Sequence, residues 1–364
     1  MNALNFVAKH IKAFPAYTPS TPLDLLSEEL GIPVENLVKL DANENPFGLL
    51  PEAKTAIVNA SFMHQYPDAD ATKLRRALAD YHHVPFENIV VGAGEDELLD
   101  LLTRMVITPG DTLLDCTPTF VMYAFNGRLT QARIITASRN ADFSLDIPEI
   151  ERVVAMERPK MLILANPNNP TGNLTAKEDI RRLLELPVLV VVDEAYVDFA
   201  PEDSSVIHWV TEFDNLIVLR TFSKFGGLAG LRVGYGVFPD GFAPVMMQVK
   251  QPYTTSVPAQ AAALATMQVV EQLQANARVI VAERDRFFQA LQVMNGIEPY
   301  PSEANFILCK VTGMSNIELY NALRRQGILI RVYQQGKLSD CVRISIGTRA
   351  QMDQVIEAMK GILS

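Results

Sequence analysis

Cysteine is scarce in this sequence, and its scarcity removes several kinds of protein from consideration. The 364 residues include three cysteines, Cys116, Cys309 and Cys341, and they form no Cys-x-x-Cys spacing. A disulfide framework or a zinc cluster needs paired or closely spaced thiols. We therefore expect a protein of a reducing compartment, the cytoplasm, and no metal site.

A basic tract and a long apolar run are missing as well. The formal net charge is −10 at pH 7, which argues against a nucleic-acid-binding surface because phosphates attract basic proteins. No segment approaches the ~18 consecutive apolar residues of a membrane span. Residues 1–20 also lack the apolar core of a signal peptide. We expect neither nucleic acid nor a membrane as a partner.

The chain does have the length and apolar content for two cores. Hydrophobic residues make up 48% of the sequence and charged residues 20%, as in an ordinary soluble enzyme. Residues 1–40 are broken by four prolines and are interpreted as an N-terminal arm. We expect a large domain over residues 41–250, then a linking helix and a small domain over residues 251–364.

Short apolar runs separated by helical spacing characterise the expected large domain. Most of the runs are apolar throughout, which is typical of strands covered on both faces of a parallel sheet. The pattern predicts a doubly wound α/β domain with a mostly parallel sheet. Its strands are expected in "NIVVGAG", "DTLLDC", "ARIITAS", "KMLILANP", "VLVVVDEAY" and "NLIVLRTFSK". The small domain, with strands in "ANFILCKV", "ILIRVY" and "CVRISIG", is predicted to be α+β and to be completed by the arm.

Unusual polar residues follow several of these strands, at the edge where open parallel sheets bind ligands. In "VVGAGEDELLDLL" the residues Gly94, Glu95 and Asp96 stand at a helix start, where unpaired N–H groups attract phosphate. The motif lacks the third glycine of a dinucleotide site and the lysine of a nucleotide-binding P-loop. Taken alone, it is more often a glycine turn with acidic capping.

An amide-rich turn and an acidic strand end come next. "NPNNPTG" supplies Asn166, Asn168 and Asn169, and "VLVVVDEAY" carries an apolar strand into Asp193 and Tyr196. A buried carboxylate is costly without a cation or donor beside it. A plain turn and a helix N-cap are the alternatives for these two motifs.

A lysine then ends the last apolar run, in "RTFSKFGGLAGLR". Lys224 lies beside Ser223, ahead of three glycines and Arg232. A lysine at a strand end is usually solvated, but a neutralised amine in a glycine-lined site bonds covalently to carbonyl compounds. The sheet edge thus offers an anion nest, amides, an acid, a phenol, an amine and an arginine.

In this order and spacing, the motifs resemble those of the fold type I pyridoxal-phosphate (PLP) aminotransferases. Within them, the chain most resembles the branch acting on histidinol phosphate, with its relatives acting on aromatic amino acids. The resemblance covers nearly the whole chain. It rests on "AYTPS", "LDANENPFG", "QYPD", "GAGEDE", "TPTF", "NPNNPTG", "DEAY", "TFSK" with "GLAGLRVGY", "ANFIL", "GILIR" and "VRISIGTR".

The resemblance implies PLP as cofactor and a role for each residue around it. Lys224 would bond to the PLP aldehyde and later move the Cα proton, and Asp193 would pair with the protonated pyridine nitrogen. Asn169 and Tyr196 would hydrogen-bond the phenolic oxygen, while Phe120 of "TPTF" would stack on the ring. The phosphate would be bound by Gly94, the amides of Glu95 and Asp96, Ser223, Arg232, and Tyr66 of the partner subunit in a homodimer.

The resemblance further implies a substrate side formed by Tyr17, Asn43, Arg331 and Arg343. The implied reaction is transamination of L-histidinol phosphate with 2-oxoglutarate in histidine synthesis. An aromatic amino acid aminotransferase and a threonine-phosphate decarboxylase of the same fold are alternatives. A silent phosphometabolite-binding protein has no need of Lys224, Asp193 and Tyr196 together, and a nicotinamide dehydrogenase lacks its fingerprint. After Lys224, Phe225 and Gly226 replace the usual alanine and aromatic, which we interpret as a packing change.

Overall fold

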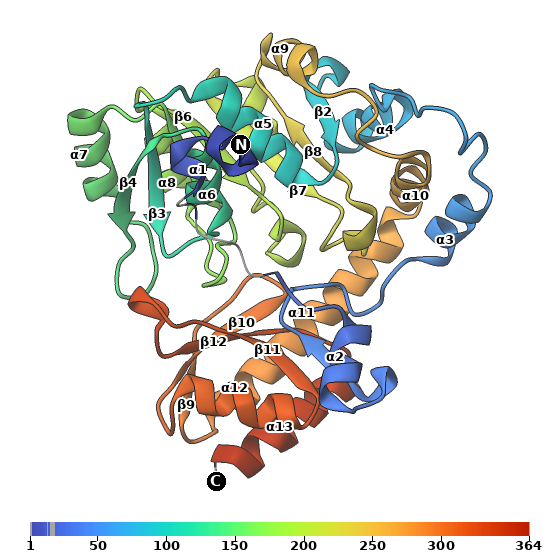
Figure 1. Ribbon diagram of the computed structural model, residues 1–364, viewed down its shortest axis with the longest axis vertical. Helices are drawn as coiled ribbons and strands as arrows, with labels where there is room; N and C mark the ends of the chain where they lie inside the picture. Colours follow the sequence, from blue (N-terminus) through green and yellow to red (C-terminus); the bar gives the residue numbers. More distant parts are fainter. Residues whose placement is uncertain (1, 13, 15–18, 364) are drawn as a thin grey trace.

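Two β-sheets organise the molecule, seen in a computed structural model that describes residues 2–12, 14 and 19–363 (Figure 1). The large sheet has the order β2-β8-β7-β6-β5-β3-β4. Strands β3 to β7 are parallel, whereas β8 runs antiparallel to both of its neighbours. Its strands are β2 (Ile89–Gly92), β3 (Thr112–Thr117), β4 (Arg133–Ser138), β5 (Met161–Ala165), β6 (Leu189–Asp193), β7 (Leu216–Thr221) and β8 (Gly234–Val237).

The apolar character of these strands has the predicted cause, since helices cover both faces of the sheet (Figure 1). Neighbouring residues of β6 alternate between two cores: Val190 and Val192 lie in one, and Val191 lies in the other. One face packs against α3 (Pro51–Val58), α4 (Thr72–His82), α7 (Ile147–Glu157), α8 (Lys177–Leu184) and α10 (Val257–Gln268). The other packs against α5 (Glu95–Val106), α6 (Met122–Leu129) and α9 (Phe242–Val249).

The small sheet has the order β1-β11-β12-β10-β9. Its first strand comes from the predicted arm and pairs in parallel with β11, while the other pairings are antiparallel. The strands are β1 (Val38–Leu40), β9 (Ile297–Pro299), β10 (Phe306–Val311), β11 (Ile328–Val332) and β12 (Cys341–Ser345). The helices beside this sheet are α2 (Leu23–Leu30) of the arm, α11 (Val270–Gln292), α12 (Asn316–Arg325) and α13 (Arg349–Leu363). The short helix α1 (Lys9–Lys12) lies instead with the large sheet (Figure 1), and Phe14, just after it, contacts Phe125 of α6 (Met122–Leu129).

The predicted fold class is confirmed, as a mixed and mostly parallel seven-stranded sheet with a smaller five-stranded one. The division of the chain into domains stays a prediction. Packing places α10 in the large-sheet core, through Ala259, Ala262 and Ala263, whereas the expected boundary at residue 250 precedes this helix. The 23-residue helix α11 then runs into the small unit (Figure 1). Among the described residues, no helix is long and apolar enough to cross a membrane.

Candidate active site

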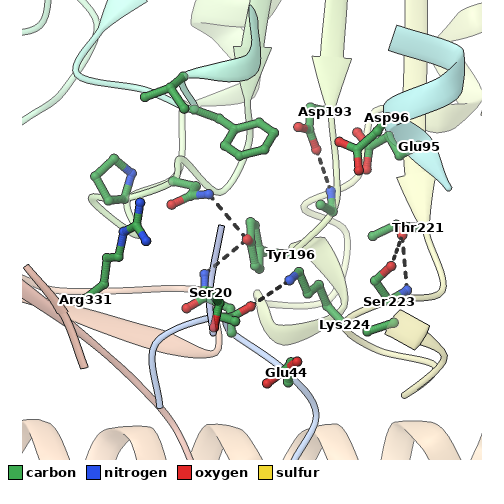
Figure 2. Close-up of a pocket in the computed structure, with 18 of the residues that line it drawn as sticks. Ser20, Glu44, Glu95, Asp96, Asp193, Tyr196, Thr221, Ser223, Lys224 and Arg331 are labelled. Carbon is green, nitrogen blue, oxygen red and sulfur yellow. Dashed lines mark hydrogen bonds between the residues drawn. The ribbon is translucent and has the colours of Figure 1, made fainter. Parts of the chain in front are cut away.

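The polar strand ends of the large sheet line one pocket (Figure 2). Strand β6 ends at Asp193, β7 leads into Ser223 and Lys224, and α5 begins at Glu95. Parallel strands end at the same edge, so the fold brings these groups together. The facing wall comes from the small sheet and from the segment after β1, and includes Asp41, Asn43, Arg331, Tyr333 and Arg343.

Lys224 points its amine into this pocket. Its Nζ donates to the Ala42 carbonyl at 2.9 Å, and it lies 5.9 Å from the centre of the Tyr196 ring. Burial lowers the pKa of Lys224 to about 8, and the positive charge of Arg343 adds to the effect. A substantial neutral fraction therefore exists near neutral pH, as a nucleophilic amine requires.

Asp193 is a buried acceptor, with 6% of the residue exposed. The amide of Ala195 donates to Oδ1 at 2.9 Å, and the Tyr123 hydroxyl donates to Oδ2 at 2.5 Å. Burial raises the pKa of Asp193, while hydrogen bonds from Glu95 and Tyr123 oppose the rise. Such a carboxylate suits a cationic nitrogen in the pocket.

The Tyr196 hydroxyl is oriented by two amides. Asn43 Nδ2 donates to it at 3.1 Å and Asn169 Nδ2 at 3.4 Å. Burial raises the pKa of Tyr196, so the phenol stays protonated. The hydroxyl oxygen accepts both of these hydrogen bonds, so its own O–H remains free to donate to a ligand oxygen.

The start of α5 forms an open anion cradle with Ser223 and Arg232. Gly94 has φ 79°, and a Cβ there would come within 2.6 Å of Arg232 Nη2. A Cβ on Gly234 would lie 2.2 Å from the Glu95 amide nitrogen. Glycine is therefore required on both sides of the cradle. A nest of N–H groups, a hydroxyl and a guanidinium beside a lysine and an acid is a donor set that fits PLP.

Phe120 lines the pocket and also packs against the core. Its ring makes an edge contact with Tyr123 at a centroid distance of 5.6 Å. Phe120 therefore lies at the border between the core and the pocket. Its stacking on a cofactor stays a prediction.

Two arginines of the small sheet face the lysine across the pocket. Arg331 and Arg343 are directly opposite in the antiparallel register of β11 and β12, which places their side chains on one face. Arg343 donates to Asn169 Oδ1 at 2.6 Å and to the Asp41 carbonyl at 2.7 Å. The Arg331 guanidinium makes no hydrogen bond or ion pair with another side chain or backbone group that the structure describes, and the residue lines the pocket, so its charge is available to a ligand.

The other predicted substrate residues are placed differently. Asn43 is 1% exposed, and its side chain hydrogen-bonds Tyr196 and Ser345. Its geometry thus favours a positioning role, and direct substrate contact stays a prediction. Tyr17 lies outside the described residues. Nearby, the Ser20 hydroxyl donates to Asp41 at 2.6 Å, which ties the arm to the pocket wall.

The structure does not bring Tyr66 to the pocket of its own chain. The residue is 81% exposed and stacks on Tyr253 at 4.5 Å between ring centroids. Val58, Phe62 and Met63 are exposed on the same stretch of chain. A role for Tyr66 in a second subunit's site stays a prediction.

Sequence reasoning missed several residues that hold the site in place. Tyr123 belongs to no motif, and nothing in its sequence position in the first turn of α6 indicates its contact with Asp193. Asn45 Nδ2 donates to the carbonyls of Lys224 and Phe225, at 3.0 Å each. A Cβ on Gly226 would lie 2.8 Å from the Phe222 carbonyl oxygen, so close packing explains this glycine.

A buried ion pair also joins the two strands that carry the acid and the amine. Arg220, on β7, lies 2.9 Å from Glu194, which directly follows Asp193. Glu194 accepts two further hydrogen bonds, from the Ser205 hydroxyl and the Val206 amide, each at 2.7 Å. Separating the two strand ends would break this pair and leave an uncompensated buried charge, which is costly. The ion pair therefore holds the ends of β6 and β7 together.

Fold and site together define a fold type I PLP-dependent transferase. The chain belongs to the class I and II aminotransferases, whose family model matches residues 35–359. It is 44% identical to the chloroplastic histidinol-phosphate aminotransferase 1 of Arabidopsis thaliana, over 98% of this chain and 85% of that protein. It is also 44% identical to the histidinol-phosphate aminotransferase of Roseiflexus castenholzii, over 97% and 96% of the two chains.

A solved structure extends the similarity to three dimensions. Histidinol-phosphate aminotransferase from Sinorhizobium meliloti, in complex with pyridoxal-5'-phosphate, superposes with a TM-score of 0.90. The alignment covers 99% of this chain and 98% of that one, at 28% sequence identity. The whole architecture, both sheets included, is therefore shared.

Proposed function

We propose that this protein is a PLP-dependent enzyme that transaminates L-histidinol phosphate with 2-oxoglutarate, giving imidazole-acetol phosphate and L-glutamate in histidine biosynthesis. The observation that carries the proposal is the pair Arg331 and Arg343 opposite Lys224. A reactive amine facing two guanidinium groups suits an amino substrate with a large anionic substituent. The similarity to histidinol-phosphate aminotransferases over nearly the full chain supports it.

The cofactor would be held by groups already in place. The α5 amides, Ser223 and Arg232 would bind its phosphate, and Asp193 would accept a hydrogen bond from the ring nitrogen. Tyr196 and Asn169 would hydrogen-bond the phenolic oxygen, and Phe120 would stack on the ring. When bound, PLP supplies an electron sink for negative charge at the substrate Cα.

The chain's own residues bind the substrate and move its proton. Arg343 and Arg331 hold the anionic substituent, and thereby fix the Cα–H bond near Lys224. The neutral amine of Lys224 would act as the base that takes the Cα proton, and as the acid that gives it back in the second half of the proton transfer. The Ala42 carbonyl, an acceptor for this amine at 2.9 Å, holds it in place whenever it is not covalently bound.

Competing amino donors test the function. For the PLP-loaded protein we expect kcat/KM for histidinol phosphate to exceed that for phenylalanine by roughly ten- to a hundredfold, since one lost charge-assisted contact costs ~1.5–3 kcal/mol. A preference for phenylalanine would instead assign an aromatic aminotransferase. Release of carbon dioxide from threonine phosphate would assign the decarboxylase.

The proposed assembly is a homodimer in which Tyr66 of the partner subunit reaches the cofactor phosphate. The exposed Tyr66 and Tyr253 rings, with Phe62 and Met63 nearby, provide an apolar surface for it. The proposed location is the cytoplasm. In support, Cys116, Cys309 and Cys341 are buried and unpaired, as expected under reducing conditions.

A further inference from the structure

Glu95 places a carboxyl group where a phosphate-binding site has no need of one. It is the first residue of α5 and lines the pocket beside Asp193 (Figure 2). Its Oε1 is shielded from solvent and has no hydrogen-bond donor among the described residues. An ionised carboxylate is costly in that position, and it would repel the phosphate held by the same helix end.

The groups that face Glu95 do little to stabilise a negative charge. Asp193 of β6 and Asp96 of its own helix are acidic, and the phenols Tyr123 and Tyr196 lie nearby. The charge of Lys224 opposes them, whereas Arg232 Nη2 binds Asp96 at 2.7 Å. Burial, and after it the charge of Asp193, hold the pKa of Glu95 well above its usual range.

The hydrogen bonds of Asp193 show where the proton on Glu95 goes. A carboxylate offers about four acceptor positions on its two oxygens. Tyr123 and Ala195 occupy two of them, and the Glu95 carboxyl lies within hydrogen-bonding reach of the same carboxylate. When two carboxyl groups share a hydrogen bond, one of them carries the proton and the other accepts it. Asp193 already accepts hydrogen bonds from two other donors, so the proton belongs on Glu95. One position on Asp193 then remains for a protonated ring nitrogen.

We propose that Glu95 is a positioning residue that stays protonated in the cofactor-loaded enzyme and donates its hydrogen bond to Asp193. A neutral Glu95 orients the Asp193 carboxylate toward the ring nitrogen and leaves the α5 amides free of a competing negative charge. The inference rests on the proposed use of PLP. It adds a carboxyl group that acts through Asp193 and touches neither substrate nor reacting atoms.

A proton linkage follows from this arrangement. In the cofactor-free protein the Glu95–Asp193 pair shares one proton and loses it to solvent as the pH rises. PLP binding must then return that proton to Glu95. At pH values above the pKa of the free pair, the affinity for PLP therefore falls as the pH rises. The fall is steeper, by up to about tenfold per pH unit, than in a protein with a neutral side chain at this position.

Cofactor titrations of the Glu95→Gln apoprotein test the proposal. The dissociation constant for PLP is measured from the visible absorption of the bound form, from about pH 6 to about pH 9, for wild type and variant. Glutamine is neutral and keeps a donor, so we expect wild-type affinity at the acid end and loss of the additional fall at the alkaline end. Glu95→Ala removes the donor, and we expect about tenfold weaker binding with the same shallow pH dependence.

A second acid on the same helix provides the matched control. Asp100 is paired with Arg104 on the exposed face of α5, and Asp100→Asn is expected to keep the wild-type pH profile. Parallel pH profiles for wild type and Glu95→Gln would overturn the proposal, as would a tenfold gain in affinity for Glu95→Gln at the acid end. Failure of the wild-type apoprotein to bind PLP at any pH would instead overturn the proposed function.

Discussion

Two influences act in the same direction on the amine of Lys224. Burial lowers its pKa to about 8 from the ordinary 10.5, and the positive charge of Arg343 is the next largest cause. The arginine that binds the substrate anion thus also helps keep the lysine neutral. Substrate binding and lysine reactivity are coupled through one guanidinium group.

This coupling predicts a pH shift in the rate of PLP capture by the apoprotein. Neutral amine is the reactive form, so the rate rises with pH and levels off above about 8. In Arg343→Gln one positive charge is gone, so we expect the midpoint to move to higher pH. Stopped-flow absorbance measures it, with Lys224→Ala as the blank without covalent capture.

Arg331→Gln is the matched control, because Arg331 is not among the causes of the shift in Lys224. Its midpoint is expected to stay at the wild-type value. An unchanged midpoint in Arg343→Gln would contradict the coupling.

Single residues were predictable where they interrupt a strong pattern. Lys224, Asp193 and Ser223 each end or follow an apolar strand, and the structure brings all three to one pocket. Tyr123 and Ala42 were not predictable, because their contacts come from elements far apart in sequence. A contact made by a backbone carbonyl, such as that of Ala42 with the Lys224 amine, does not depend on the type of residue and so cannot be predicted from the sequence.

At the scale of elements, the antiparallel strands β11 and β12 place the two arginines side by side but in different surroundings. Arg343 is 7% exposed and hydrogen-bonded on two nitrogens, whereas the guanidinium of Arg331 faces the pocket without such bonds among the described residues. Arg343 is therefore held in place by its neighbours, whereas the charge of Arg331 is left for a ligand. Glutamate and histidinol phosphate, which differ in the size and charge of their anion, are expected to use them unequally.

Half-reaction kinetics of the two variants test this division. Arg343→Ala is expected to harm both half-reactions, because either anion contacts this arginine. Arg331→Ala is expected to reduce the histidinol-phosphate half-reaction more, by roughly ten- to a hundredfold, since a larger and more highly charged group loses ~1.5–3 kcal/mol of charge-assisted binding. Equal losses for both donors in Arg331→Ala would contradict it.

Elements with a clear hydrophobic pattern were predictable, and three short strands were not. Strand β8 begins at a glycine and contains two of them, which hides its pattern, yet Gly234 is needed to clear the Glu95 amide. Strands β1 and β9 have three residues each. Runs that short gain their structure from their neighbours rather than from their own sequence.

At the scale of the whole molecule, the proposed role of Tyr66 requires an assembly. Tyr66 is 81% exposed and does not line the pocket of its own chain. In the proposed homodimer, each active site takes its amine from one chain and this hydroxyl from the other.

Mixed dimers test that arrangement. Lys224→Ala is expected to be inactive and Tyr66→Ala impaired. After subunit exchange, a hybrid dimer has one site with both residues intact, so activity is expected to rise above that of either parent. Native mass spectrometry verifies the exchange. Hybrids that form without any gain would place Tyr66 outside the partner's site.

The pairing of β1 with β11 has a consequence for how the enzyme is made. A ribosome releases Val38–Leu40 before the large sheet, but the strand it must join, Ile328–Val332, is synthesised after that sheet. The large sheet uses residues 89–237 and is complete long before that. Domains generally fold as units as they emerge. Each nascent chain therefore acquires Lys224 and Asp193 before it has Arg331 or Arg343. The side of the pocket proposed to bind the cofactor thus forms before the side proposed to bind the substrate.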